Sequence, residues 1–337
     1  MTMLKVACVG AGYFSQFHID SWKRMERAVL VGVCDRDLDR AKATGAPAFA
    51  DVEEMLAETQ PDIVDVILPP NAQAQVIRHA IGHSPRAIIC QKPFCASPQE
   101  ARVITDRAEV AGVPLIVHEN FRFQPWYRAI KAAMDQGRIG EVRQVTFRLR
   151  PGDGQGADAY LDRQPYFRNM PRLLIHETGV HFLDTFRYLL GPARSVYADL
   201  RQENAVLSGE DAGYVLMEHA GGARTLFDGN RCLDHAADNP RRTMGEGLIE
   251  GTEGVLRLSG DGSVSLRAFG AQAEKVLLSP DVFEGFGGDC THALQAHVVA
   301  GLLDGTPIEN PARDYLTVLA MEEAAYASAK SGRKVAL

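Results

Sequence analysis

An acid and an imidazole stand four residues apart in the second half of the sequence. The stretch 177–190 has the apolar spacing of a helix and carries Glu177, His181 and Asp184. Residues i and i+4 share one helix face, so Glu177 can orient the His181 ring. An imidazole titrates near neutral pH and can take the proton of an alcohol while hydride leaves the carbon. We interpret His181 as a general acid/base and Asp184 as a hydrogen-bonding residue. The alternative is a histidine that only fills the interior.

A lysine stands directly after a short apolar run in the first third of the chain. Gln91-Lys92-Pro93 follows residues 87–90, which have the composition of a buried strand. Ligands of open parallel sheets bind at the carboxyl ends of the strands, where a lysine can orient a substrate hydroxyl and share its proton. The alternative is a solvated surface charge, the common role of lysine. The position of Lys92 favours a catalytic role.

Two glycines precede the first predicted helix. Gly10 and Gly12 follow an apolar strand at residues 4–9. Gly10 permits a tight turn, and Gly12 lets a pyrophosphate approach the main chain at the helix N-terminus. Ser15 occupies the third small position, and its hydroxyl can donate to phosphate. This order of strand, glycine turn and helix predicts a dinucleotide site.

An acid ends the second predicted strand. Asp35 follows residues 29–34 and can accept hydrogen bonds from the adenosine ribose while repelling a 2′-phosphate. We therefore expect NAD. Arg36 beside it can accept a phosphate, which leaves NADP as an alternative. The structural alternative is an aspartate that only caps the next helix.

Two histidines flank Glu177 in a pattern similar to a zinc protease motif. His176 and His181 are five residues apart, about 500° around a helix, so they cannot bind one metal from the same face. A zinc site assembled from His118, Glu119, His176 and His181 is the alternative. We expect no metal.

Further polar side chains lie in two segments near these residues. Amide, phenol and imidazole groups suit a polyhydroxylated substrate, and guanidinium groups also suit a carboxylate. We therefore expect a sugar, a polyol or a sugar acid. The residues expected to bind it are His118, Asn120, Arg122, Tyr166, Arg168, Asn169 and Arg172.

Two regions of different character must position these groups. Up to residue 122, apolar runs of strand length alternate with helical stretches, which predicts parallel βαβ units in a doubly wound sheet. After residue 122, strand-like runs separated by glycines predict a mostly antiparallel sheet. We expect domains at 1–122 and 123–337, with the ligand at their junction.

The composition limits the class of protein. A chain of 337 residues predicts about two domains. Its net charge of −7 disfavours nucleic acid and anionic membrane surfaces as partners. No apolar run approaches the roughly 20 residues that cross a bilayer. The six cysteines show no paired spacing, so we expect reduced thiols and a cytoplasmic protein.

Several short motifs occur in an order typical of one known family. They are Gly10-x-Gly12, Pro69-Pro70-Asn71, Lys92-Pro93, Gly179-Val180-His181-x-x-Asp184, Ile249–Gly254 and Glu323–Ser328. Over nearly the whole chain the sequence resembles the Gfo/Idh/MocA oxidoreductases, the group of glucose–fructose oxidoreductase and inositol dehydrogenase. The resemblance implies a catalytic lysine in a Glu-Lys-Pro motif, matched by Lys92, and an Asp-x-x-x-His pair, matched by His181. It also implies an N-terminal Rossmann domain and a C-terminal α/β domain whose open, predominantly antiparallel sheet forms an interface in a homodimer or homotetramer.

Three positions depart from that pattern. Gln91 replaces the usual glutamate, Glu177 stands where aspartate is usual, and Ala74 replaces a frequent histidine. Gln91 cannot carry the negative charge that would keep Lys92 protonated. With the resemblance, the expected cofactor-binding residues are Gly10, Gly12, Tyr13, Phe14, Ser15, Asp35, Arg36, Pro69, Asn71, Gln91 and Lys92.

These observations predict an NAD(P)-dependent dehydrogenase. Hydride passes between a hydroxyl-bearing carbon of a sugar, polyol or sugar acid and the nicotinamide, and Lys92, His181 and Glu177 are the predicted catalytic residues. One alternative is an enzyme that retains and recycles its cofactor in an internal redox, isomerisation or elimination-type glycoside cleavage. The other is a non-catalytic regulator that senses dinucleotides.

Overall fold

The computed structural model describes residues 3–281 and 285–337. The chain divides into two compact units. Unit 1 comprises Met1–Asn120 and Asp289–Thr317, and unit 2 comprises Phe121–Gly288 and Val318–Leu337. The unit that holds most of the predicted segment 1–122 therefore also contains a segment from late in the chain. The two units are described separately below.

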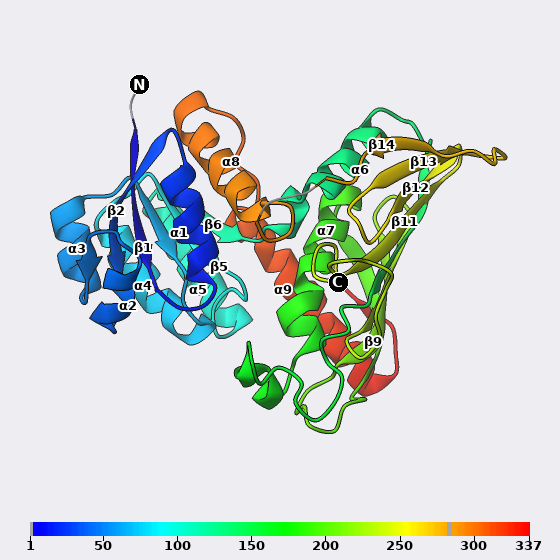
Figure 1. Ribbon diagram of the computed structural model, residues 1–337, viewed down its shortest axis with the longest axis horizontal. Coiled ribbons are helices and arrows are strands. Elements are labelled where there is room, and N and C mark those ends of the chain that lie inside the picture. Colours follow the sequence, from blue (N-terminus) through cyan, green and yellow to red (C-terminus); the bar gives the residue numbers. More distant parts are fainter. Residues whose placement is uncertain (1–2, 282–284) are drawn as a thin grey trace. The chain divides into compact units, whose positions relative to one another are not determined.

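Unit 1 contains a six-stranded parallel sheet in the order β3-β2-β1-β4-β5-β6 (Figure 1). This is the strand order of the doubly wound dinucleotide-binding fold, so the predicted Rossmann domain is confirmed. The order reverses between β1 and β4, where such folds bind their ligand. The strands are β1 (Leu4–Val9), β2 (Ala28–Cys34), β3 (Ala48–Phe49), β4 (Ile63–Val66), β5 (Ala87–Gln91) and β6 (Leu115–His118).

Helices flank this sheet, and their first turns follow local sequence signals. Asp51 caps α3 by accepting the Glu54 N–H, and Ser97 caps α5 by accepting the Glu100 N–H. Proline at the first helical position of α5 fits the same signal. The helices of unit 1 are α1 (Ser15–Arg24), α2 (Leu38–Ala43), α3 (Val52–Thr59), α4 (Pro70–Gly82), α5 (Pro98–Val110) and α8 (Cys290–Asp304).

The late segment belongs to unit 1 because it pairs with the edge strand β6. Pro311 bridges Ile116, and the Asn310 carbonyl accepts the Val117 N–H at 3.0 Å. The Asn310 side chain also donates to the Glu119 carbonyl. These contacts satisfy main-chain groups that an edge strand otherwise leaves exposed.

Unit 2 contains a nine-stranded sheet in the order β14-β13-β12-β11-β7-β10-β9-β8-β15. Only the β7–β10 pair is parallel, which confirms the mostly antiparallel sheet that the sequence predicts. The strands are β7 (Val142–Leu149), β8 (Ala193–Arg201), β9 (Ala212–His219), β10 (Arg224–Asn230), β11 (Gly245–Gly251), β12 (Gly254–Leu258), β13 (Val264–Ala268), β14 (Lys275–Leu278) and β15 (Val335–Ala336).

Helices pack on one face of this sheet. Phe182 on α7 contacts Phe147 on β7 and Phe227 on β10, with ring centroids 4.2 and 5.2 Å away. Ser328 on α9 receives the Ala198 N–H of β8. The helical segments are η1 (Phe121–Phe123), α6 (Pro125–Asp135), η2 (Pro165–Asn169), η3 (Leu174–Gly179), α7 (Val180–Leu190) and α9 (Ala312–Ser331), which begins in unit 1.

The described part of the chain has neither a membrane-spanning helix nor a disulfide. Within residues 3–281 and 285–337, no helix is long and apolar enough to cross a membrane. No disulfide joins the cysteines, all six of which lie in the described part. Burial raises the pKa of the Cys34 thiol to about 11 and that of Cys95 to about 12, so both remain protonated at neutral pH.

Candidate cofactor site and active site

The glycine turn after β1 leaves the start of α1 open to a ligand. Gly10 has φ +109°, and a Cβ there would lie 2.3 Å from the Ile67 carbonyl oxygen, so only glycine fits. A Cβ on Gly12 would meet no protein atom within 4 Å. The N-cap residue is Phe14, whose side chain cannot accept hydrogen bonds from the first turn. These features fit an anionic group bound at the helix N-terminus.

Asp35 binds the glycine turn itself. Its Oδ2 accepts the Ala11 N–H at 2.7 Å, and its Oδ1 accepts the Asp37 N–H at 2.9 Å. The acid is half-buried and Arg36 is exposed. Asp35 thus fixes the loop that is predicted to receive a pyrophosphate, in addition to its predicted role at the ribose.

An open hollow lies over the first turn of α1. It has a volume of about 480 Å³ and is lined by Ala11, Gly12, Tyr13, Gln16 and Arg40. Tyr13 is 47% exposed, so its ring is available to a flat ligand group. The Ser15 hydroxyl donates to the Gly12 carbonyl at 2.6 Å, and its predicted contact with phosphate stays a prediction. Its hydroxyl thus stabilises the turn.

The ends of β4 and β5 are tied together by a glutamine that the sequence analysis did not single out. Gln73 is fully buried on α4, and its Nε2 lies within 3.1 Å of the carbonyl oxygens of Leu68, Gln91 and Pro93. Its Oε1 accepts the Cys95 N–H at 2.7 Å. A buried amide among apolar residues at the start of a helix is the sequence signal that could have found it.

Lys92 lies at the carboxyl end of β5, as predicted. It is half-buried, and the Lys92–Pro93 peptide bond is cis. Because β5 pairs with β4 and β4 with β1, Lys92 lies two strands from the Gly10 turn at the same edge of the sheet. Pro69 and Asn71 are exposed at the start of α4. Predicted cofactor residues from the loops after β1, β4 and β5 therefore lie at one edge of the parallel sheet.

The polar residues after β6 are buried within unit 1. His118 is 1% exposed, and its ring lies against that of His18 with centroids 4.0 Å apart. Asn120 is 2% exposed and donates to Thr291 Oγ1 at 3.3 Å. Their predicted contact with substrate remains a prediction.

His181 lies in the first turn of α7 and is held by an aromatic stack. It is 7% exposed, and Phe121 lies parallel to its ring, with centroids 3.8 Å apart and 4° between the planes. The stack covers one face of the imidazole. Both ring nitrogens lie in the ring plane, so the Phe121 ring, which lies parallel to that plane, does not occupy their hydrogen-bonding directions.

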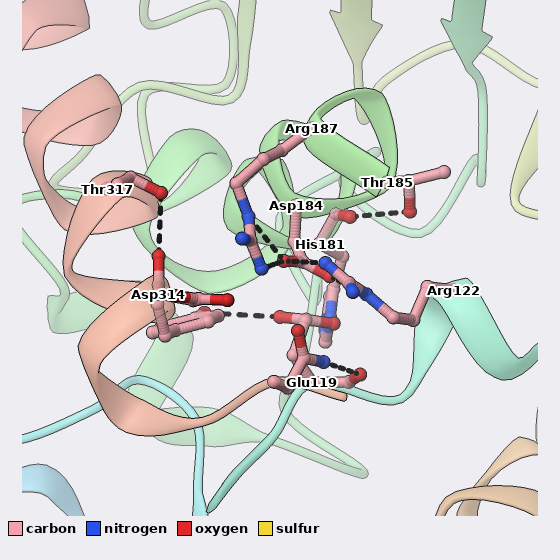
Figure 2. A network of polar contacts seen from close by, with 10 residues as sticks. Glu119, Arg122, His181, Asp184, Thr185, Arg187, Asp314 and Thr317 are labelled. Carbon is pink, nitrogen blue, oxygen red and sulfur yellow. Dashed lines mark hydrogen bonds and ion pairs between the residues drawn. The ribbon is translucent and has the colours of Figure 1, made fainter. Parts of the chain in front are cut away.

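Arg122, one residue after Phe121, binds the same helix. Figure 2 shows the Asp184 carboxylate between the guanidinium groups of Arg122 and Arg187. Arg122 Nε and Nη2 lie 2.8 and 2.7 Å from the two carboxylate oxygens, and Arg187 Nη2 lies 3.0 Å from Oδ1. Asp184 is fully buried, so this bidentate pair fixes η1 against α7. Arg122 therefore has a clear structural function besides the predicted contact with substrate.

The helix that carries Glu177 differs from the regular one that the sequence predicts. Leu174–Gly179 forms a π-helical turn, and the α-helix begins only at Val180. Glu177 therefore lies in the π turn, and the geometry of a regular α-helix does not relate it to His181. The ring of His176 in the same turn contacts Glu322 Oε1 through Nδ1 at 2.6 Å. The main-chain N–H of His176 donates to the Tyr326 hydroxyl. π turns are frequent at functional sites.

A buried arginine that the sequence analysis missed supports this turn. Arg231 is 1% exposed. It donates to Thr178 Oγ1 at 2.6 Å, to Tyr160 Oη at 2.5 Å and to Asp153 Oδ2 at 3.0 Å. It thereby joins the glycine-rich loop 151–159 to the π turn. Nothing in its local sequence distinguishes it from a surface arginine.

The remaining predicted substrate residues precede the π turn. Tyr166 is 56% exposed, Asn169 is exposed and Arg168 is half-buried. Arg172 forms an ion pair with Glu323 and lies 4.2 Å from the centroid of the Tyr326 ring. The structure thus leaves Tyr166 and Asn169 accessible and engages Arg172 with α9.

Metal binding finds no support in the part of the chain that the structure describes. Residues 3–281 and 285–337 contain no group of three or more His, Cys, Asp and Glu side chains arranged to hold a metal ion.

The fold and the glycine turn define an NAD-binding oxidoreductase. Residues 4–119 match the family model described as "Oxidoreductase family, NAD-binding Rossmann fold", and residues 127–257 match the GFO/IDH/MocA C-terminal domain. The chain belongs to the GFO/IDH/MocA family. The predicted family, enzyme class and cofactor NAD are thereby confirmed.

Similar proteins cover nearly the whole chain. The chain is 32% identical to a D-apiose dehydrogenase of Paraburkholderia graminis, over 99% of this chain and 89% of that protein. It is 31% identical to a D-apiose dehydrogenase of Rhizobium rhizogenes, over 99% and 98%. A crystal structure of an oxidoreductase from Agrobacterium radiobacter in complex with NAD+, L-tartaric acid and magnesium is 29% identical. It superposes with a TM-score of 0.90 over 99% of this chain and 98% of that one.

Proposed function

We propose that this protein is an NAD-dependent dehydrogenase of a sugar or polyol hydroxyl, with D-apiose as the first candidate substrate. The observation that carries the proposal is the position of Lys92, at the same sheet edge as Gly10 and two strands away. A cationic donor at that edge can reach the reacting end of a dinucleotide bound at the glycine turn. The similarity to D-apiose dehydrogenases supports this substrate class.

The residues have separate roles in this proposal. Gly10, Gly12 and Asp35 would hold NAD, which when bound supplies the hydride acceptor. Lys92 orients the substrate hydroxyl, and His181 takes its proton. Phe121 keeps the His181 ring in one plane, as their parallel stack suggests.

The exposed residues of unit 2 are the remaining candidates for contact with substrate. Tyr166 and Asn169 can hydrogen-bond to hydroxyl groups, and both are accessible. A sugar acid is the finer alternative, since L-tartaric acid is bound in the similar Agrobacterium radiobacter structure. We place the reaction in the cytoplasm, where cysteines that form no disulfide remain reduced.

The test is the reduction of NAD by the purified protein with D-apiose, inositols, aldoses, alditols and aldonates. We expect turnover with at least one sugar or polyol, and a loss of at least about 100-fold in kcat for Lys92→Met and for His181→Ala. Wild-type turnover in both variants would contradict the assigned roles. Product formed without net NAD reduction would favour the enzyme that recycles its cofactor.

We also propose that the open face of the nine-stranded sheet joins copies of this chain. Tyr197, Tyr214 and Leu216 on this face are 41, 51 and 42% exposed. Leu216 lies opposite Tyr197 on one side and Leu226 on the other, so an apolar stripe crosses three strands. Sedimentation should give a dimer or tetramer, and Leu216→Glu should dissociate it. A monomeric wild-type protein would contradict this proposal.

A further inference from the structure

A chain of buried polar groups in unit 1 ends on the main chain of Lys92. The Gln91 side chain is 7% exposed, and its Oε1 accepts the Lys92 N–H at 2.7 Å. Its Nε2 lies 3.0 Å from Nε2 of His18. His18 is fully buried on α1, and its Nδ1 lies 2.9 Å from Oδ2 of Asp65 on β4. Three elements of the fold, α1, β4 and β5, therefore meet in one hydrogen-bonded chain.

The donor and acceptor roles in this chain follow from chemistry. A main-chain N–H can only donate, so the Gln91 atom that it contacts must be the amide oxygen. The amide nitrogen of Gln91 then faces His18, and an amide nitrogen can also only donate. His18 Nε2 must therefore accept, which leaves the ring proton on Nδ1, where it donates to Asp65. Turning the amide around would place two donors against each other at the Lys92 N–H, and two acceptors, the amide oxygen and Nε2 of the Nδ1–H ring, against each other at His18.

The acid at the far end of the chain is held by several neutral donors. Asp65 Oδ2 accepts from Trp22 Nε1 at 2.8 Å and from Gln295 Nε2 at 3.2 Å, in addition to His18. Asp65 and Gln295 are fully buried. A further titratable group against the His18 ring is His118 on β6, with ring centroids 4.0 Å apart. A buried carboxylate with three N–H donors on one oxygen fixes the orientation of each donor.

We propose that His18 is a positioning residue for Lys92. Asp65 holds its ring in the Nδ1–H form, and its Nε2 orients the Gln91 amide that receives the Lys92 N–H. This inference rests on the proposed role of Lys92 in the reaction. It also assigns a function to Gln91, because the buried Gln91 side chain accepts the hydrogen bond of the Lys92 main-chain N–H.

The first test reads the His18 ring directly and needs no substrate. We would record long-range ¹H–¹⁵N correlations of histidine-labelled protein and assign His18 by its loss in His18→Gln. We expect a protonated Nδ1 and an unprotonated Nε2. In Gln91→Glu, a carboxylate at position 91 can only accept, so His18 Nε2 should become protonated. A protonated Nε2 in the wild type, or an unchanged ring in Gln91→Glu, would overturn the proposal.

The second test reads the effect on Lys92. His18→Leu removes the acceptor for Gln91, and we expect kcat to fall at least about tenfold while the Kd of NAD changes less than about twofold. His18→Gln retains a side-chain oxygen that can accept, so it should recover part of kcat. Thr105→Val is the matched control, because it removes a buried hydroxyl on α5 that donates to the Ala101 carbonyl of its own helix. Its kcat should stay within about twofold of the wild type.

The outcomes separate this inference from the proposed function. If Lys92→Met keeps full turnover, the proposed function fails, while the ring measurement still decides the state of His18. If Lys92→Met is inactive and folded His18→Leu keeps wild-type kcat, the positioning role is wrong and the proposed function stands. Should His18→Leu fail to fold, the ring measurements on the wild type and Gln91→Glu decide the matter.

Discussion

The ring of Phe121 lies parallel to the imidazole of His181, with centroids 3.8 Å apart and 4° between the planes. The two residues are 60 positions apart in the chain. Their contact is reinforced by the adjacent pair of Arg122 with Asp184, which lies three residues beyond His181 on α7. A short 3₁₀ turn and one helix face therefore fix both the plane of the imidazole and the helix that carries it.

The stack leads to the first prediction. Phe121→Leu keeps an apolar side chain but loses the ring, and an aromatic pair contributes about 0.5–1.5 kcal/mol beyond its buried area. We expect kcat to fall up to about tenfold with the Kd of NAD unchanged. Phe147→Leu is the matched control, because Phe147 stacks on Phe182 and also lies in the core of unit 2. An equal loss of kcat in Phe147→Leu would show that the loss comes from a loosened core of unit 2 and not from the missing stack on His181.

The buried ion pair leads to the second prediction. Arg122→Met leaves the buried Asp184 carboxylate without its bidentate partner, and breaking a buried pair costs about 3–5 kcal/mol. Arg187→Met should cost less, because Asp184 keeps both bonds from Arg122. Urea unfolding measures both free energies of unfolding. If Arg122→Met costs no more than Arg187→Met, Arg122 does not fix the turn to α7.

The two glycines of the cofactor turn give a third prediction that separates folding from binding. Gly10→Ala places a Cβ 2.3 Å from the Ile67 carbonyl oxygen at a φ of +109°, so it should lower the melting temperature. Gly12→Ala meets no protein atom within 4 Å, so its melting temperature should stay within a few degrees of the wild type. Its new methyl group points into the space that a pyrophosphate needs. Calorimetric titration should therefore show NAD affinity weakened at least about tenfold, and unchanged affinity would place the pyrophosphate elsewhere.

Most of the fold could be predicted from the sequence, because buried parallel strands and amphipathic helices have strong local signals. The apolar runs at β1, β2, β4, β5 and β6 all lie in the predicted sheet. The two-residue strands β3 and β15 are too short for a recognisable pattern. The edge strand β14 is as long as β4 and β6, but its residues are exposed or half-buried, so it lacks their continuous burial. The glycine turn could also be predicted, because Gly10 and Gly12 stand between an apolar strand and a helix in the sequence.

The surroundings of the predicted site residues could not be predicted, because they depend on contacts between distant segments. The contact of Arg122 with substrate stays a prediction, but its bond to Asp184, 62 positions away, has no signal in the local sequence. Arg231 and Gln73 are buried and tie loops together, and no periodicity marks such residues. The π turn at Leu174–Gly179 has the same apolar spacing as a regular helix over so few residues.

Asp35 leads to the fourth prediction, which concerns cofactor choice. Both carboxylate oxygens already accept main-chain N–H groups, and Asp35→Asn keeps only one such acceptor. The variant should lose about tenfold in NAD affinity and part of its discrimination against NADP, since the repelling charge is gone. Asp51→Asn, which changes an aspartate that caps α3, is the control. A full preference for NAD in Asp35→Asn would assign the discrimination to another residue.

His219 leads to the fifth prediction, which concerns acid stability. Burial lowers the pKa of His219, although its hydrogen bond to the Gly191 carbonyl partly opposes this. The unfolded chain, in which histidine has its ordinary pKa of about 6.5, therefore binds a proton at a higher pH than the folded protein does. The unfolded state then binds more protons, so the free energy of unfolding falls as the pH drops below about 6.5.

Replacing His219 by a residue that does not titrate removes its contribution to the pH dependence of the free energy of unfolding. In His219→Gln, the free energy of unfolding should be lower at pH 8 because the buried bonds to Gly191 and Thr225 are disturbed. Its decline between about pH 6.5 and 5 should be shallower than that of the wild type, since the folded and unfolded states no longer differ in proton binding at this position. Urea unfolding at a series of pH values gives both curves. Parallel curves across this range would mean that His219 has the same proton affinity in the folded and unfolded chain.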